Sequence, residues 1–312
     1  MSQLFLKACF SAALIGFFST PAVADNIADS RTTGDRNLST IDQAGVDVTG
    51  ASEAFIVQSG DRNSSEIGQG KSTGIRQHGP RSANVTQTGD DNQSRVEQNG
   101  PNNTADVEQT GDGNESDVKQ GSVDLADDNE ARVTQLGDDN LSRVVQRDGT
   151  PTGRRQHGKR SAVVLQDGEE NNSSVEQTGP NNIANVEQLG SGNESDVLQD
   201  SVDLADDNEA IVVQMGDGNL STVAQSEGIP TGRRQHGFRQ VTVLQDGTDN
   251  ISNVVQQGPN NSASVEQFGE LNESEIFQVG GDGTSQNTAT VFQSGRGNRS
   301  RILQAGKPTG KR

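Results

Sequence analysis

Apolar and polar residues alternate along most of this chain, and the alternating stretches recur about every 11 residues. One stretch reads Asn92-Gln-Ser-Arg-Val-Glu-Gln98, and the same pattern returns from Asn103 and from Asn114. In this seven-residue core, Asn holds position 0, Ser or Ala position 2, Val or Ile position 4, and Gln position 6. A spacing of two places these side chains on one face of a β-strand and the intervening residues on the other.

Turns are predicted between the cores. Each core is followed by Gly and two variable residues, commonly Asp-Gly, Asp-Asp or Pro-Asn, which favour tight turns. We count 21 versions of the core, the first starting at residue 37 and the last at residue 298. The apolar spacing does not fit a helix, and the recurring Gly would weaken one.

This pattern predicts an all-β fold, a β-solenoid of stacked strand-turn-strand coils. Two consecutive units give about 22 residues per coil, and 21 strands give about ten coils in a single continuous stack over residues 37–304. At about 4.8 Å per coil the cross-β-like stack is about 50 Å long. Position 4 provides most of the apolar burial, about 2 kcal/mol for each Val. The expected core residues are Val96, Val107, Val118, Val175, Val186, Val197, Val254, Val265, Ile276, Val291 and Ile302.

Stacking of such coils places Asn over Asn and Gln over Gln. Side-chain amides in these columns hydrogen-bond along the stack and add to the backbone bonds between coils. The expected ladder residues are Asn92, Gln98, Asn103, Gln109, Asn114, Gln120, Asn171, Gln177, Asn182, Gln188, Asn193, Gln199, Asn250, Gln256, Asn261, Gln267, Asn298 and Gln304.

A second, longer period of 79 residues relates larger blocks of the chain. His78-Gly79, His157-Gly158 and His236-Gly237 mark equivalent joints. Each full block holds six units, with an insert after the fourth. The predicted division is a partial block at 37–78, followed by blocks at 79–157, 158–236 and 237–312; duplication explains it.

The first 24 residues have the order of a secretory signal peptide. Lys7 is followed by an apolar stretch from Ala8 to Phe18, and small residues precede a cleavage point after about Ala24. The apolar stretch is too short to span a bilayer, and no later segment approaches that length. We therefore expect a secreted protein without membrane insertion, with a short segment, 25–36, before the repeats. Cys9, the only cysteine, is removed with the signal peptide.

Composition alone indicates disorder rather than a globule. Hydrophobic residues make up 28% of the chain and aromatic residues 3%, which is too little apolar surface to offset chain entropy in an irregular fold. The strict period of the few apolar residues overrides that indication. The formal net charge of −19 disfavours nucleic acid as a partner.

The motif Gln-x-Gly-x-x-Asn-x-Ala/Ser-x-Val-x-Gln resembles the curlin repeat of curli fibre subunits. It occurs here from Gln98 to Gln109 and again from Gln177 to Gln188, and similar units cover nearly everything after residue 36. The chain departs from the family in having about twice the coils of a five-repeat subunit. Arg81, Arg160 and Arg239 also replace Asn at position 0 of three units.

The resemblance implies a bacterial functional amyloid that functions in biofilm and cell adhesion. Subunits of this family cross the outer membrane unfolded through a secretion channel, meet a nucleator subunit, and polymerise at the cell surface. By resemblance, the internal Asn and Gln residues support self-assembly, while Gly and Asp in some repeats restrain it. The expected partners are therefore further copies of this chain, a nucleator and the channel.

Three other groups of residues are candidate sites. His78, His157 and His236 are too far apart to share a metal and are interpreted as turn residues at block joints. The pairs Arg154-Arg155, Arg233-Arg234 and Lys311-Arg312 could contact another subunit or a matrix polysaccharide, but solvated loops are favoured. The Asp-rich turns could bind calcium, yet Gly280-Gly-Asp-Gly283 is a single near match to a calcium-binding repeat, and gatekeeping by Asp is favoured.

No cofactor, metal site or enzyme activity is expected. The strand faces carry no His that could act as a base for a nucleophilic Ser. The first hypothesis is a structural fibre subunit, supported by the amide columns and by the expectation of an uncapped last coil. The alternative is a monomeric secreted β-solenoid that acts as an adhesin or ligand-binding surface.

Overall fold

The computed structural model describes residues 26–43, 51–70, 79–121, 128–148, 158–201, 207–226, 237–280 and 286–306. Every regular element in these ranges is a β-strand. The strands are β1 Ile27–Thr33, β2 Leu38–Asp42, β3 Ser52–Ser59, β4 Ser64–Gly70, β5 Arg81–Thr88, β6 Gln93–Asn99, β7 Asn103–Thr110, β8 Glu115–Gly121, β9 Asp128–Leu136, β10 Leu141–Arg147, β11 Lys159–Glu169, β12 Asn172–Thr178, β13 Asn182–Ser191, β14 Glu194–Asp200, β15 Asp207–Asp217, β16 Leu220–Ser226, β17 Phe238–Thr248, β18 Ile251–Gln257, β19 Asn261–Glu270, β20 Glu273–Val279, β21 Asn287–Arg296 and β22 Arg299–Ala305.

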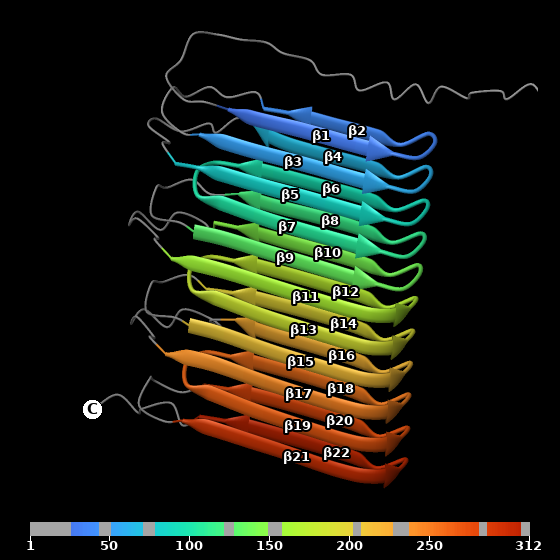
Figure 1. Cartoon of the computed structure of the whole chain (residues 1–312). Helices are drawn as coiled ribbons and strands as arrows, with labels where there is room; N and C mark the ends of the chain where they lie inside the picture. Colours follow the sequence, from blue (N-terminus) through green and yellow to red (C-terminus); the bar gives the residue numbers. More distant parts are fainter. Residues whose placement is uncertain are drawn as a thin grey trace, which may run out of the picture.

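The strands form two parallel sheets that face each other. Odd-numbered strands make one 11-stranded sheet and even-numbered strands make the other, both in chain order. Each odd strand and the even strand after it make one coil, and the coils stack along one axis from β1/β2 to β21/β22 (Figure 1). The predicted all-β solenoid is confirmed.

The solenoid begins one strand earlier than the sequence predicted. The segment 25–36, expected to precede the repeats, contains β1, which pairs in parallel with β3 and places Ala28 beside Ala54. Ser30 and Thr32 occupy the positions that Val or Ile and Gln hold elsewhere, so the repeat pattern does not reveal this unit. The stack therefore starts at Ile27 rather than residue 37.

The residues per coil vary more than the prediction of about 22. Neighbouring strands of a sheet are offset by 22 residues at Arg160 and Asn182, by 26 at Asn103 and Asn129, and by 31 at Asn129 and Arg160. Equivalent positions of the unit still pair in every case. The extra residues therefore lie in connections and leave the strand register unchanged.

All of the variation in length is confined to one edge of the solenoid. We call the connections from odd to even strands the short-turn edge; the turn between Ser59 and Ser64 is an example. The connections from even to odd strands, the long-loop edge, range from the three residues 100–102 to the stretch between Arg147 and Lys159. The two edges lie on opposite sides of the stack (Figure 1).

Glycine is required at the first position of each short turn. Gly60 has φ +116°, and a Cβ there would lie 2.0 Å from the carbonyl oxygen of Gly89 in the next coil. Gly89 repeats this relation with Gly111, and a column of glycines continues along the edge. Only Gly allows turns at this conformation to stack so closely.

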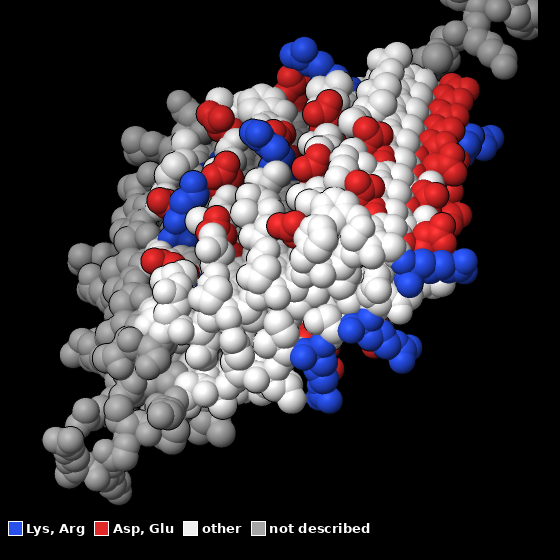
Figure 2. All heavy atoms as spheres, turned by 90° about the horizontal axis from the view of Figure 1, so that it is seen from below, with Lys and Arg blue, Asp and Glu red and all other residues white. Residues whose placement is uncertain are grey.

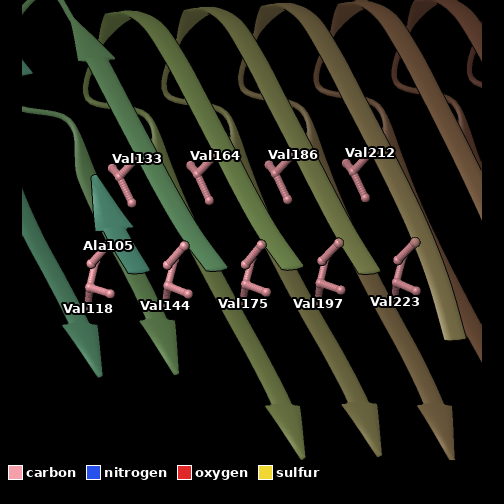
Figure 3. Packing of buried hydrophobic residues seen from close by; sticks show 14 of the residues in the cluster. Ala105, Val118, Val133, Val144, Val164, Val175, Val186, Val197, Val212 and Val223 are labelled. Carbon is pink, nitrogen blue, oxygen red and sulfur yellow. The ribbon is translucent and has the colours of Figure 1, made fainter. Parts of the chain in front are cut away.

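The core is a narrow apolar double row between the sheets. Val133, Val164, Val186 and Val212 extend from the odd sheet toward the row of Val residues from the even sheet that includes Val144 (Figure 3). All five side chains are at most 2% exposed. The repeated position-4 residues thus fill the space between the sheets in every inner coil.

Position 2 distinguishes the two sheets in sequence. Odd strands carry Ala there, except for Val241, and even strands carry Ser. Ala105 and Ser116 illustrate the alternation in consecutive strands. This regular alternation of Ala and Ser indicates two sheets. A repeat motif that allows either Ser or Ala at position 2 does not contain this information. It also identifies residues 26–32, with Ala28, as an odd-strand unit.

Candidate self-assembly site

Glutamine side chains form an unbroken ladder through the even sheet. From Gln43 to Gln304, the Nε2 group of each position-6 Gln donates to Oε1 of the Gln in the following coil, at 2.8–3.1 Å. Gln98 Nε2 also donates to the backbone carbonyl of Ser82 in the odd sheet, at 2.8 Å. The ladder therefore joins all eleven coils and also ties the two sheets together.

The odd sheet has a similar ladder that begins one coil later. It extends from Gln58 to Gln293 with Nε2–Oε1 distances of 2.7–2.9 Å. In β1 the equivalent position is Thr32. Gln58 Oε1 is buried and has no hydrogen-bond partner among the described residues. The first coil is thus imperfect in this sheet.

Asparagine ladders run in the opposite sense. In the even sheet, Asn92 Nδ2 donates to Oδ1 of Asn63 in the preceding coil, at 3.1 Å, and this bond recurs at 2.8–3.1 Å up to Asn298. Asn92 Nδ2 also donates to the carbonyl of Gly111, at 2.7 Å. The Asn column therefore holds the short turns in line with one another.

The equivalent column of the odd sheet is interrupted by buried arginines. Arg160 is 1% exposed, and its guanidinium donates to Asn129 Oδ1, to the carbonyl of Gly179 at 3.1 Å, and to Asp148 Oδ1 at 2.6 Å. Arg239 donates to Asn208 Oδ1 at 2.6 Å. Arg81 is also buried, and this burial lowers the pKa of its guanidinium. Each arginine lies at position 0, as the sequence indicated, but inside the stack.

Most expected ladder residues lie inside the stack. All of them except those of the last coil are at most 1% exposed, whereas Asn298 is exposed and Gln304 is half-buried. The expected core residues are likewise buried, with Ile302 of the last coil only partly so. Position in the stack, rather than residue type, separates the last coil from the rest.

Apart from the three buried arginines, charged side chains of the described residues lie on the outer surfaces, where several pair between coils. Arg299 Nε lies 2.9 Å from Glu273, Arg301 lies 3.0 Å from Glu275, and Arg296 lies 3.5 Å from Glu270. In the short turns, Arg62 makes hydrogen bonds of 2.6 Å to both carboxylate oxygens of Asp91. This contact lowers the pKa of Asp91 and raises that of Arg62.

Carboxylates also form a row along the short-turn edge. The backbone N–H of Asp61 donates to Asp90 Oδ1 at 2.7 Å, and that of Asp90 donates to Asp112 Oδ1 at 2.7 Å. A row of acidic residues is visible at the right of Figure 2, on the side of the short turns. Figure 2 also shows basic side chains toward the end of the stack that faces the viewer.

Several sequence predictions fall outside the described residues. These are the signal peptide, the three histidines, and the pairs Arg154-Arg155, Arg233-Arg234 and Lys311-Arg312. Within the described ranges, no group of three or more His, Cys, Asp or Glu residues could hold a metal ion. These ranges also contain no apolar helix of a length that crosses a membrane.

Each end of the stack presents two strand edges to which no described strand pairs. At one end they belong to β1 and β2, and at the other to β21 and β22. In the even sheet the two ends carry the same inward residues, Asn, Ser, Ile and Gln, at equivalent positions. The Asn and Gln columns of the even sheet run up to these edges.

Stacked parallel coils with continuous amide ladders define a parallel β-solenoid of the cross-β type. The family model of the curlin associated repeat matches residues 82–111, 89–121, 161–190 and 258–286. The chain therefore contains curlin associated repeats, which confirms the resemblance in the sequence. No curated protein matches the chain. The repeats and the fold fit a curli-type structural subunit, a class that is structural rather than enzymatic.

Proposed function

We propose that this chain is a structural subunit of an extracellular, curli-type amyloid fibre that self-assembles by end-to-end stacking of solenoids. The observation that carries the proposal is the Gln ladder from Gln43 to Gln304, which reaches unpaired strand edges at both ends of the described stack. In the even sheet, another copy can extend the same backbone and amide bonding without any new type of contact.

The internal stacking supports this proposal energetically. Each inner coil bonds to two neighbours through both sheets, whereas a terminal coil bonds to one. Asn298 and Gln304 are more exposed than their counterparts in inner coils for this reason. Docking of a further copy removes this difference and covers Ile302, so growth at an end is favourable once a stack exists.

The proposal includes export and partners. The chain is secreted after cleavage near Ala24, passes an outer-membrane channel, and meets a nucleator subunit at the cell surface, where the fibre contributes to the biofilm matrix. The curlin-repeat family supports these steps. The predicted divisions at 37–78, 79–157, 158–236 and 237–312 then act as successive blocks, with strand β1 added before them.

Seeded assembly of the purified mature chain tests the function. We expect a lag, then β-rich fibres that bind an amyloid dye, and removal of the lag by preformed seeds. Val164→Asp, which buries a carboxylate in the core, should prevent assembly. Val163→Asp is the matched control, because Val163 lies on the outward face of the same strand.

A folded monomer that stays soluble for days at high concentration would contradict the fibre. That outcome would favour the alternative of a monomeric adhesin or ligand-binding surface. Equal assembly of the Val164→Asp and Val163→Asp variants would instead mean that fibre formation does not require this solenoid core.

A further inference from the structure

The two ends of the stack differ chemically because the amide ladders have a direction. In the even sheet, the Gln Nε2 groups point toward the C-terminal end and the Oε1 atoms toward the N-terminal end. The Asn column has the reverse sense, since Asn298 Nδ2 donates toward Asn272. The C-terminal end thus offers an Nε2 donor at Gln304 and an Oδ1 acceptor at Asn298.

The N-terminal end offers the complementary groups in the same columns. Gln43 Nε2 is used inside the chain by Gln69 and the carbonyl of Ile27, so its Oε1 points to the free edge. In this column the backbone N–H of each Asn donates to Oδ1 of the Asn in the preceding coil, as Asn63 does to Asn37. The backbone N–H of Asn37 is therefore oriented toward the free edge. These groups match Gln304 and Asn298 when a second copy stacks in the same sense.

Charge is complementary at one turn position across the same two ends, although the first coil, residues 26–43, carries Arg31 and Arg36 besides its three Asp residues. The described residues of the last coil, 286–306, contain Arg296, Arg299 and Arg301 and no acidic residue. Arg296 occupies a turn position that repeats in every coil and forms a column along the stack. Glu270 holds this position in the preceding coil, and Asp61 and Asp35 hold it at the N-terminal end. Inside the chain, Arg296 pairs with Glu270 of the adjacent coil. In a joint between copies, Arg296 meets Asp35, whereas two C-terminal ends would place arginines together.

The odd sheet does not match as well at this joint. In the continued register, Val291 of β21 meets Ser30, and Gln293 meets Thr32. The Ser30 and Ser39 hydroxyls hydrogen-bond to each other within the first coil. Thr32 leaves Gln58 Oε1 without a partner among the described residues. One half of the joint therefore lacks the apolar and amide contacts found between inner coils.

We infer that fibres grow by stacking the β21/β22 end of one copy on the β1/β2 end of a second copy, in a joint matched in the even sheet and weak in the odd sheet. This inference rests on the proposed function and assigns the polarity, register and weakest contact of the fibre. Two ends of the same kind mismatch in ladder direction, and two C-terminal ends also repel through their arginines.

Cysteine cross-linking tests the register directly, since Cys9 is the chain's single cysteine and lies in the predicted signal peptide. In the proposed joint, Thr40 lies beside Arg301 of the other copy, both on the outer face of the even sheet. Fibres of the variant T40C/R301C should give a covalent ladder of multimers after mild oxidation. The control T40C/T290C places the second thiol on the opposite face and should give none.

Repair of the weak half provides the second test. The variant S30V/T32Q supplies the missing Val and Gln and should lower the critical concentration for seeded growth about tenfold. The control T33Q/T40V adds the same residue types to exposed positions of the first coil and should grow like the wild type.

A charge variant separates the joint from overall stability. Asp35→Lys should slow elongation several-fold, whereas Asp112→Lys, the same change in the same column of an inner coil, should not. The proposed joint would be contradicted if fibres of T40C/R301C fail to cross-link. It would also be contradicted if Asp35→Lys and Asp112→Lys elongate at the same rate. Absence of wild-type fibres would instead contradict the proposed function itself.

Discussion

At the scale of single residues, Arg160 shows how the stack accommodates a buried charge. Arg160 occupies a position held elsewhere by Asn, and it is accommodated by Asn129, the carbonyl of Gly179 and the carboxylate of Asp148. A buried guanidinium without these contacts would be strongly unfavourable. The arginine and Asp148 therefore act as one unit.

Arg160→Ala should lower the free energy of unfolding by about 3 kcal/mol, because it leaves the Asp148 carboxylate without its buried ionic partner. Denaturant unfolding measures the change. The double variant D148N/R160N should lose much less, since it restores the Asn of neighbouring coils and removes both charges. An Arg160→Ala variant as stable as the wild type would show that the ion pair contributes little.

A second residue-scale prediction concerns a strained turn. Leu271 has φ +57° and is 47% exposed, at a turn position where Gly192 and Gly297 occur in other coils. Leu271→Gly should raise the free energy of unfolding by about 0.5–1 kcal/mol, because the left-handed penalty exceeds the entropic cost of Gly. Leu271→Ala keeps the penalty and is the control. An equal gain from Ala would attribute the effect to removal of exposed apolar surface.

At the scale of the elements, each short turn is shaped by the turn of the next coil. Gly137 has φ +100°, and a Cβ there would lie 2.2 Å from the carbonyl oxygen of Gly168. A side chain at this position must push two coils apart as well as adopt an unfavourable conformation. The turns therefore contribute to coil spacing.

Gly137→Ala should accordingly reduce the free energy of unfolding by about 1–3 kcal/mol. Gly68→Ala is the matched control, because no atom lies within 4 Å of a Cβ added on that strand and its φ is not positive. Unfolding of the two variants in denaturant distinguishes them. Similar free energies of unfolding for the two variants would mean that the stacked turns can accommodate a Cβ at Gly137 without loss of stability.

The sequence predicts strands well where the period is strict and poorly where residues depart from it. Val107 and Gln109 identify their strand and its inward face from spacing alone. The repeat pattern does not predict β1, because Ser30 and Thr32 replace the Val or Ile and the Gln that identify the other strands. Backbone pairing with β3 nevertheless forms this strand. The burial of Arg160 could not be predicted from the repeat either, because its partner Asp148 lies in a connection outside the repeat. The alternation of Ala and Ser at position 2 distinguishes odd from even strands in the sequence.

At the scale of the whole molecule, strong negative charge opposes the association that the strand edges favour. The chain carries a formal net charge of −19, and acidic residues form a row along one edge (Figure 2). Copies approaching each other repel until short-range backbone and amide bonds form. Assembly should therefore depend on ionic strength.

Raising NaCl from a few millimolar to about 0.15 M, where the Debye length is about 8 Å, should shorten the lag of unseeded assembly. Dye fluorescence and sedimentation measure the lag and the yield. KCl at equal ionic strength should act alike, because the effect is screening rather than ion binding. A lag that lengthens with salt would mean that attraction between opposite charges, as at Arg296 and Asp35, dominates encounter.

The confinement of all length variation to the long-loop edge bears on how such a chain changes in evolution. A duplicated 79-residue block adds three whole coils, so odd strands remain odd and every inward residue keeps its place. Insertions between Arg147 and Lys159 leave the register of β9, β11 and β13 intact. Gene duplication can therefore lengthen the protein, and foreign peptides inserted at this edge should be displayed at regular intervals along a fibre without redesign of its core.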